Sequence, residues 1–230
     1  MNRPMNEDLE RSLQPGRMIN SDNPAVVAFA NNTAGSGDAR ERVVRLYYAV
    51  RDGFRYDPYK IDLSSDGLSA SRVLTNGYGW CIPKAALLAA ACRVIGVPAR
   101  LGLADVRNHL SSANLREVMG TDIFYRHGYT VIYLEGRWVK ATPAFNIDLC
   151  RKFGLHTLEF DGIEDSICHS FDLQGNQYME YVNFHGEFDD VPCEDLLQVF
   201  ARYYPNLPRL DNASWDDDVD AEVSNVQTNN

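Results

Sequence analysis

The most informative part of the sequence is Gly77-Tyr-Gly-Trp-Cys-Ile-Pro-Lys-Ala-Ala-Leu-Leu-Ala-Ala-Ala-Cys-Arg-Val-Ile95. Alanine and leucine are strong helix formers, so the stretch predicts a helix over residues 81–95. Pro83 falls in the first turn, where its missing N–H costs nothing, and Gly96 and Pro98 mark the end of the helix. Because this helix is apolar on nearly every side, we expect it to lie buried at the centre of the protein.

The sequence predicts a helix before the central helix and mainly strands after it. Asp38 and Glu41 have the spacing of a capping box and predict an earlier helix that ends near Gly53. After the central helix, Glu135-Gly136 is a hairpin signal between two runs of strand character. The elements predicted in this half are strands over 99–103, 127–134, 137–142, 157–160, 167–172 and 177–182, and a last helix over 192–204. Helices followed by an antiparallel sheet are typical of the α+β class.

The length and charge of the chain indicate how it is divided into a domain and terminal segments. It has 230 residues, 22 of them basic and 32 acidic, for a net charge of −10. We expect a loose arm over residues 1–20, a domain over 20–210 with a C-terminal extension from 147 to 210, and a disordered acidic tail over 211–230. The tail holds five Asp, one Glu and no basic residue. The surplus of acid argues against binding to nucleic acid or to an anionic membrane surface.

The N-terminus and the cysteines predict a cytoplasmic location. The first residues are polar and lack the apolar core of a secretion signal. The longest apolar run, residues 85–97, contains Arg93 and is too short to span a bilayer. Five cysteines cannot all pair within one chain, so reduced thiols are the expected state.

Cys81 stands at the predicted start of the central helix, where a thiol can take part in chemistry. The helix dipole and the free N–H groups of a first turn stabilise negative charge, so a thiol there is more acidic than a free one. The same N–H groups could hold an oxyanion during attack on an acyl carbonyl. The alternative is a small apolar side chain that only packs, which is the interpretation we give to Cys92, three turns further along.

A nucleophilic cysteine needs a base, and His127 is the histidine at the start of a well-defined strand. If the hairpin at residues 135–136 has a loop of two or four residues, residues whose numbers sum to 271 lie opposite each other. Thr142 then lies on the same face as His127, as a diagonal neighbour. A three-residue loop would place Thr142 on the other face. His127 could also be a surface residue, and the other candidates are His109, His156, His169 and His185.

These residues carry a resemblance in their order and spacing. Gly79-Trp-Cys81, the helix that ends in Gly96-Val-Pro-Ala-Arg100, and the strands from His127 to Lys140 resemble the core of the transglutaminase-like superfamily. The similarity runs from about residue 38 to 146. It implies a papain-like core in which the helix that bears the cysteine packs on an antiparallel sheet. It also implies that Cys81 is the nucleophile and His127 the general base.

The third residue of the catalytic set departs from the pattern of the superfamily. An Asp is usual four positions after the tryptophan of the second hairpin strand, and this chain has Thr142 there, counted from Trp138. A threonine hydroxyl can accept a hydrogen bond from the imidazole but carries no charge to stabilise imidazolium. Asn146 or Asp148 could take over the role, or the site could be degenerate.

The resemblance implies a thiol-dependent acyl transfer on amide or isopeptide bonds of a peptide or protein. Hydrolysis by a protease or amidase is favoured over transglutamination. The alternative is a degenerate domain that binds a peptide or protein partner without turnover. No nucleotide motif is present, so we expect no cofactor, and the sequence does not indicate an oligomeric state. We expect no metal either, because no CxxC or HxxxH spacing occurs among Cys150, His156, Cys168, His169, His185 and Cys193.

Overall fold

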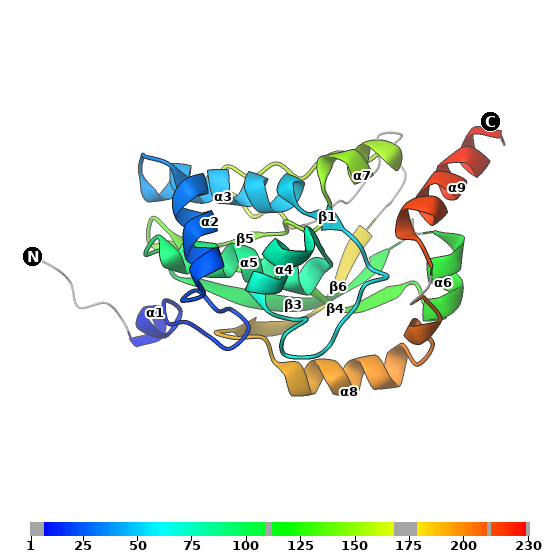
Figure 1. Cartoon of the computed structure of the whole chain (residues 1–230), viewed down its shortest axis with the longest axis horizontal. Helices are drawn as coiled ribbons and strands as arrows, with labels where there is room; N and C mark the ends of the chain where they lie inside the picture. Colours follow the sequence, from blue (N-terminus) through cyan, green and yellow to red (C-terminus); the bar gives the residue numbers. More distant parts are fainter. Residues whose placement is uncertain (1–6, 109–111, 168–178, 211–212, 229–230) are drawn as a thin grey trace, which may run out of the picture.

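A computed structural model describes residues 7–108, 112–167, 179–210 and 213–228 (Figure 1). Its helices are α1 (Glu7–Arg11), α2 (Pro24–Ala34), α3 (Ala39–Gly53), α4 (Ala70–Asn76), α5 (Cys81–Val94), α6 (Ala113–Met119), α7 (Ile147–Lys152), α8 (Cys193–Tyr203) and α9 (Trp215–Thr228), with a 3₁₀ turn η1 (Leu207–Leu210). Its strands are β1 (Arg55–Tyr56), β2 (Tyr78–Gly79), β3 (Ala99–Asn108), β4 (Ile123–Leu134), β5 (Arg137–Ala141) and β6 (Met179–Phe188). This arrangement of helices with an antiparallel sheet is the α+β fold that the sequence predicts.

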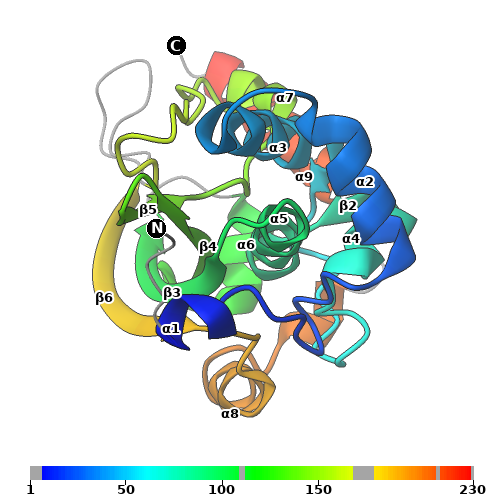
Figure 2. The same ribbon diagram turned by 90° about the vertical axis from the view of Figure 1, so that its left-hand side faces the viewer.

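Helix α5 lies at the centre of the molecule, as its composition predicts. Figure 2 shows it end-on, with the sheet on one side and α2, α3 and α4 on the other. Every residue from Cys81 to Arg93 is buried. The many alanines on the helix allow these neighbours to pack closely around it. Cys92 is completely buried, which confirms its assignment to the core.

The main sheet has the strand order β5-β4-β3-β6, and all three pairings are antiparallel. Leu134 pairs with Arg137 and Thr130 with Ala141, so the hairpin loop has two residues and paired numbers sum to 271. Glu135 and Gly136 both have positive φ, of 50° and 88°, as the tight turn between twisted strands requires. The short strands β1 and β2 form a separate parallel pair beside the start of α5.

The chain ends differ from the loose arm and disordered tail that we expected. Residues 7–11 form α1, and Met18 and Ile19 that follow it are buried in the core. Residues 215–228 form α9, whose Trp215 packs against the ring of Tyr59 at a centroid distance of 5.3 Å. Helix α9 is acidic in composition, but its apolar residues lie on one face, and this face packs against the rest of the protein.

The second half of the sheet also needs correction. Residues 157–160 form no strand, and the Leu158 carbonyl in this segment accepts a hydrogen bond from the side chain of Arg51. The strand predicted over 167–172 lies almost wholly outside the described residues, and the one predicted over 177–182 is observed from Met179 onward, as β6. The last predicted helix is confirmed as α8. Among the described helices, none combines the length and the apolar character needed to cross a bilayer.

Candidate active site

Cys81 is the first residue of α5, and 7% of its surface is exposed. The backbone N–H groups of Gly128, Ile82 and Cys81 itself lower the pKa of the thiol. These donors stabilise the thiolate, but burial is the larger effect and raises the pKa of Cys81 to about 12. The sequence predicts a more acidic thiol, because it shows the helix start and not the depth at which that start is buried.

Gly128 lets the start of α5 approach strand β4 closely. A Cβ atom at this position would lie 2.9 Å from the Cα atom of Ile82 and 3.2 Å from its backbone nitrogen. Real Cβ atoms essentially never lie so close to a backbone carbon. The absence of a side chain therefore lets the β4 backbone pack directly against the first turn of α5.

The substitution Gly128→Ala is expected to separate α5 from β4 and to lower the free energy of unfolding by about 1–3 kcal/mol. Because it would move the Gly128 N–H, which lowers the pKa of Cys81, away from the thiol, it is also expected to slow the alkylation of Cys81. Thermal unfolding and Cys81 alkylation rates measure the two effects. Gly136→Ala is the matched control, because no atom within 4 Å would meet its Cβ, and only the cost of its positive φ is expected. A free energy of unfolding that is the same in wild type and Gly128→Ala would contradict the packing role of Gly128.

His127 immediately precedes Gly128 on β4 and is buried. It pairs with Ala104, whereas Phe124 pairs with Val106, so two residues of β4 stand opposite the single residue Asp105. This irregularity is a β-bulge, a feature that commonly re-aims a side chain near an active site.

Arg126 forms the bulge in a left-handed conformation, with φ of 62°. Its N–H donates to the carboxylate of Asp105 at 3.1 Å, and its guanidinium donates to Asp195 on α8 at 2.7 and 3.1 Å. A non-glycine residue in this conformation costs about 1–3 kcal/mol and persists only when its surroundings hold it. Asp105 and Asp195 supply that support, one residue before His127.

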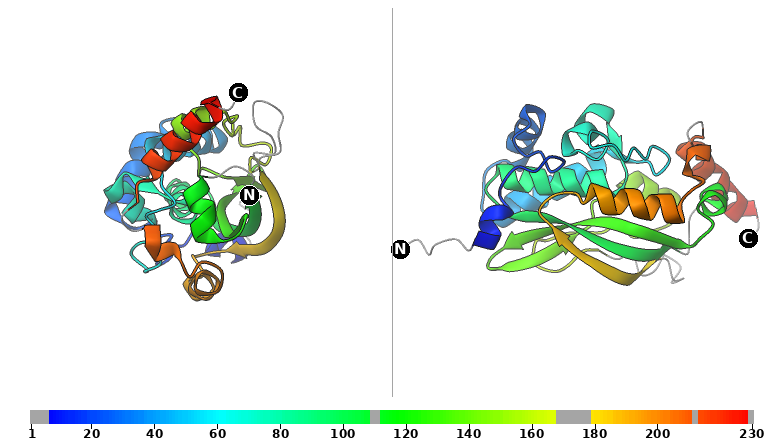
Figure 3. Two further views of the ribbon diagram at one scale, coloured as in Figure 1. Left: turned by 90° about the vertical axis from the view of Figure 1, so that its right-hand side faces the viewer. Right: turned by 90° about the horizontal axis from the view of Figure 1, so that it is seen from below.

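Cys81 and His127 line the same small cavity, of about 40 Å³. The other lining residues are mostly apolar and include Trp80, Tyr56 and Phe124 on the inner side. Helix α8 and the turn after it close the outer side with Phe200, Tyr204 and Leu207. Figure 3 shows α8 alongside the sheet, with α6 and α9 together at one end of the molecule.

Thr142 and His127 share a neighbour, Tyr181 of β6. The Thr142 hydroxyl lies 3.4 Å from the Tyr181 hydroxyl, which donates a hydrogen bond to the Ile167 carbonyl at 2.7 Å. The Tyr181 ring packs edge-on to the His127 ring at a centroid distance of 6.5 Å. The ring of Phe145 packs against His127 at the same distance.

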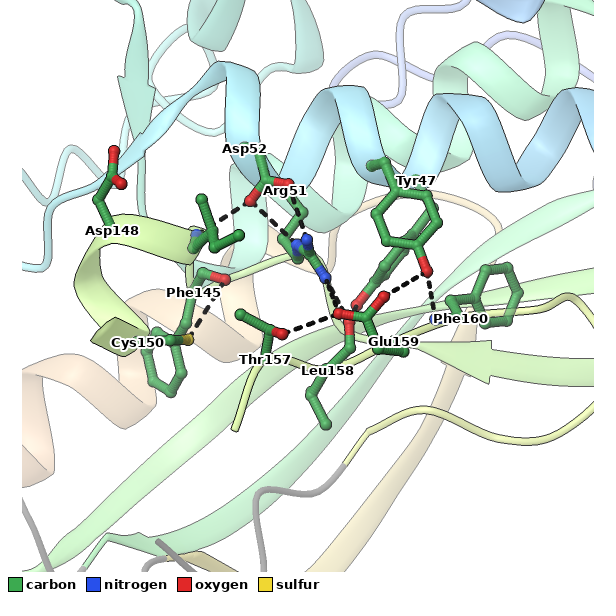
Figure 4. Close-up of polar contacts among 12 residues, drawn as sticks. Tyr47, Arg51, Asp52, Phe145, Asp148, Cys150, Thr157, Leu158, Glu159 and Phe160 are labelled. Carbon is green, nitrogen blue, oxygen red and sulfur yellow. Dashed lines mark hydrogen bonds and ion pairs between the residues drawn. The ribbon is translucent and has the colours of Figure 1, made fainter. Parts of the chain in front are cut away.

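None of the three candidate third residues, Thr142, Asn146 and Asp148, is among the residues that line this cavity. The Asn146 side chain accepts a hydrogen bond from the backbone N–H of Tyr56 at 3.1 Å. The Asp148 side chain is 78% exposed and lies 3.5 Å from Arg151. Figure 4 shows Asp148 apart from the polar contacts around Arg51.

A polar network around Arg51 holds the segment that carries Phe145. Arg51 is buried and donates to Asp52 at 2.7 and 3.0 Å and to the Leu158 carbonyl at 2.7 Å (Figure 4). Asp52 in turn accepts from the backbone N–H of Ile147 at 2.9 Å. These bonds fix the start of α7, two residues after Phe145.

Lys84 supports the same segment from α5 and is completely buried. Its Nζ donates to the carbonyl oxygens of Arg51 at 2.9 Å, Phe54 at 2.6 Å and Ala144 at 2.8 Å. The Lys84 amine thus connects the end of α3 with Phe54, which precedes β1, and with Ala144, which precedes Phe145. Burial lowers the pKa of Lys84 to about 7.

The remaining histidines and cysteines lie apart from this cavity or outside the described residues. His156 is exposed, and His185 lies 2.7 Å from the Asp105 carboxylate. His109, His169 and Cys168 fall outside the described residues. The four described cysteines, Cys81, Cys92, Cys150 and Cys193, are free thiols. Among the residues that the structure describes, no group of three side chains is arranged to bind a metal ion.

The structure adds several residues that the sequence did not single out: Gly128 through its N–H, Asp105 and Arg126 through the bulge, Tyr181 and Phe145 through their rings, and Phe200 and Tyr204 through the outer wall. The glycine that follows His127 was a visible signal. The others depend on pairings between strands and helices that are distant in the sequence.

A cysteine-bearing helix packed centrally on a curled antiparallel sheet defines the transglutaminase-like class of α+β proteins. The chain belongs to this class: the sequence model of the transglutaminase-like superfamily matches residues 27–143. The match includes both Cys81 and His127 and ends just after Thr142.

Two solved structures are similar to the chain. One is a "putative cysteine protease" from Cytophaga hutchinsonii, with 17% identity over 82% of this chain and 58% of that chain and a TM-score of 0.48. The other is a "putative protease" from Parabacteroides distasonis, with 18% identity over 54% of this chain and 25% of that chain and a TM-score of 0.36. The chain thus spans only part of the length of either protein. No curated protein matches it.

Proposed function

We propose that the protein is a thiol hydrolase that cleaves amide or isopeptide bonds of a peptide or protein through Cys81 and His127. One observation carries this proposal: the side chains of Cys81, at the start of the buried helix α5, and of His127 line one cavity. Membership of the superfamily supports the same assignment.

The proposed reaction moves one proton between the two side chains. His127 takes the thiol proton as the Cys81 sulfur attacks the amide carbonyl, and N–H groups at the start of α5 hold the oxyanion. The tetrahedral intermediate collapses to a thioester and expels the amine, which receives the proton from the imidazolium. Water, deprotonated by His127, then attacks the thioester and restores the thiol.

The buried setting of Cys81 explains why the base is needed. A thiolate alone in this cavity is disfavoured, since burial raises the pKa of Cys81 to about 12. A thiolate next to an imidazolium forms a neutral pair, for which the cost of burial is smaller. We therefore expect Cys81 to be reactive at neutral pH only while His127 is present.

Acylation by p-nitrophenyl acetate tests this function, because a cavity of about 40 Å³ has room for a group the size of an acetyl. We expect a stoichiometric burst of p-nitrophenolate and an acetyl group on the peptide that contains Cys81. The Cys81→Ala variant should show neither, and Cys92 should stay unmodified. A wild-type protein without a burst would contradict the proposal.

A second candidate is a degenerate domain that binds a peptide without turnover. Two observations favour it: a neutral Thr142 stands where a carboxylate is usual, and the cysteine is deeply buried. Peptide binding to a wild-type protein that cannot be acylated would support this candidate.

Thr142 and Asp148 give opposite expectations as third members of the site. The substitution Thr142→Val removes the hydroxyl beside Tyr181 and is expected to slow acylation of Cys81 by up to about tenfold, the effect of one hydrogen bond. Asp148→Asn is expected to leave the rate unchanged, because its side chain is exposed and lies beside Arg151. A marked loss in Asp148→Asn without one in Thr142→Val would transfer the role to Asp148.

A further inference from the structure

A groove leads from the surface to the cavity that contains Cys81. It lies between residues 58–63 and the C-terminal half of α8, and its volume is about 490 Å³. Five residues line both the groove and the cavity: Pro58, Ile61, Phe200, Tyr204 and Leu207. The groove is therefore continuous with the candidate active site, and its volume falls within the range typical of ligand sites, about 300–1,000 Å³.

The lining of the groove is apolar and carries little charge. Leu197 of α8 belongs to it, and half of this side chain, 50%, is exposed. The neighbouring residues of the same helix, Leu196 and Phe200, are buried in the core, so Leu197 is not needed to hold α8 in place. Asp62 is the single charged side chain among the residues that line this groove.

We propose that this groove binds a bulky apolar side chain of the peptide substrate and so sets the sequence preference of the enzyme. This inference rests on the proposed function, since the bound side chain would position a neighbouring amide at Cys81. A leucine or phenylalanine would cover Leu197, Ile61 and Phe200 and remove apolar surface from water. An acidic side chain is disfavoured, because Asp62 would repel it and no basic residue in the lining would attract it.

Fluorescence polarisation of two dye-labelled hexapeptides tests the inference in the full-length Cys81→Ala variant, which cannot turn them over. The peptides share a Gly/Ser frame and differ in a central pair, Leu-Leu or Asp-Asp. We expect the Leu-Leu peptide to bind at least about tenfold more tightly, as two buried leucines would allow. Adding Leu197→Asp should remove most of this preference.

Val182→Asp in the same background is the matched control. Val182 lies on β6, is 48% exposed and lines neither the groove nor the cavity, so its replacement should leave the preference unchanged. Thermal unfolding of both variants checks that each keeps its fold. Equal binding of the two peptides, or the same loss in both variants, would overturn the inference.

The two proposals fail in different ways. Acylation of Cys81 without a preference for the Leu-Leu peptide would refute the groove and leave the hydrolase standing. A preference that depends on Leu197 in a protein that p-nitrophenyl acetate does not acylate would refute the hydrolase and keep the apolar peptide site.

Discussion

Replacing His127 with alanine is expected to slow the acylation of Cys81 by p-nitrophenyl acetate at pH 7 by about 10²- to 10⁴-fold, the usual contribution of a general base. The buried thiol then has no acceptor for its proton, and burial keeps it protonated. Stopped-flow detection of p-nitrophenolate measures the rate, and intact mass confirms the modified protein.

His156→Ala is the control for this effect. His156 is exposed and does not line the cavity, so its replacement should leave the burst unchanged. Because alanine at position 127 could also disturb packing against Phe145 and Tyr181, His127→Gln serves as a second variant that fills the space without a basic nitrogen. An unchanged burst in both variants would contradict the role of His127.

Replacing Lys84 with methionine is expected to lower the free energy of unfolding by about 2–4 kcal/mol, because three buried carbonyl oxygens lose their donor. For a chain of this size the loss corresponds to a fall in Tm of roughly 5–15 °C. The segment before Phe145 should loosen too, which would slow acylation of Cys81. Lys152→Met is the control, since Lys152 is exposed and forms a surface ion pair with Asp220 on α9.

The pH dependence of stability gives a separate test of the lowered pKa of Lys84. Burial lowers its pKa from 10.5 to about 7, so between these values the unfolded chain binds a proton that the folded chain does not. The stability of the wild type relative to Lys84→Met should therefore rise from about pH 7 to pH 10.5 and be constant below about pH 7. A difference that does not change across that window, in denaturant titrations at each pH, would contradict the lowered pKa of Lys84.

The sequence predicts those parts of the fold that depend on local signals. Alanine and leucine indicate α5, and Glu135-Gly136 establishes the pairing of β4 with β5 to the residue. The assignment of Cys81 and His127 as a catalytic pair rests on these two elements and stays a prediction. Both residues also lie in the segments whose resemblance to the superfamily is most specific.

The bulge beside His127 could not be predicted, because it depends on contacts between distant strands. Asp105 on β3 holds Arg126, and Tyr181 reaches the site on β6, which pairs with β3 and not with β4. The expected acidity of Cys81 failed for a related reason: depth of burial is set by α8 and its turn, more than a hundred residues later.

Helix α9 was missed although the sequence contained its signal. Trp215, Val219 and Val223 follow at intervals of four residues, the spacing of one helical face, and all three pack on the core. The surrounding Asp residues dominate the composition and led to the prediction of disorder. Periodicity is the better guide for such a segment, because a few apolar residues on one face suffice to dock a helix.

The central claim is that Cys81 and His127 act as one proton-transfer pair, and the pH profile of Cys81 alkylation by iodoacetamide tests it most directly. In the wild type we expect appreciable alkylation between pH 6 and 8, far below the pKa of about 12 that burial imposes on the thiol, and a loss of this neutral-pH reaction in His127→Gln. Identical profiles for the two proteins, each rising only at strongly alkaline pH, would contradict the account.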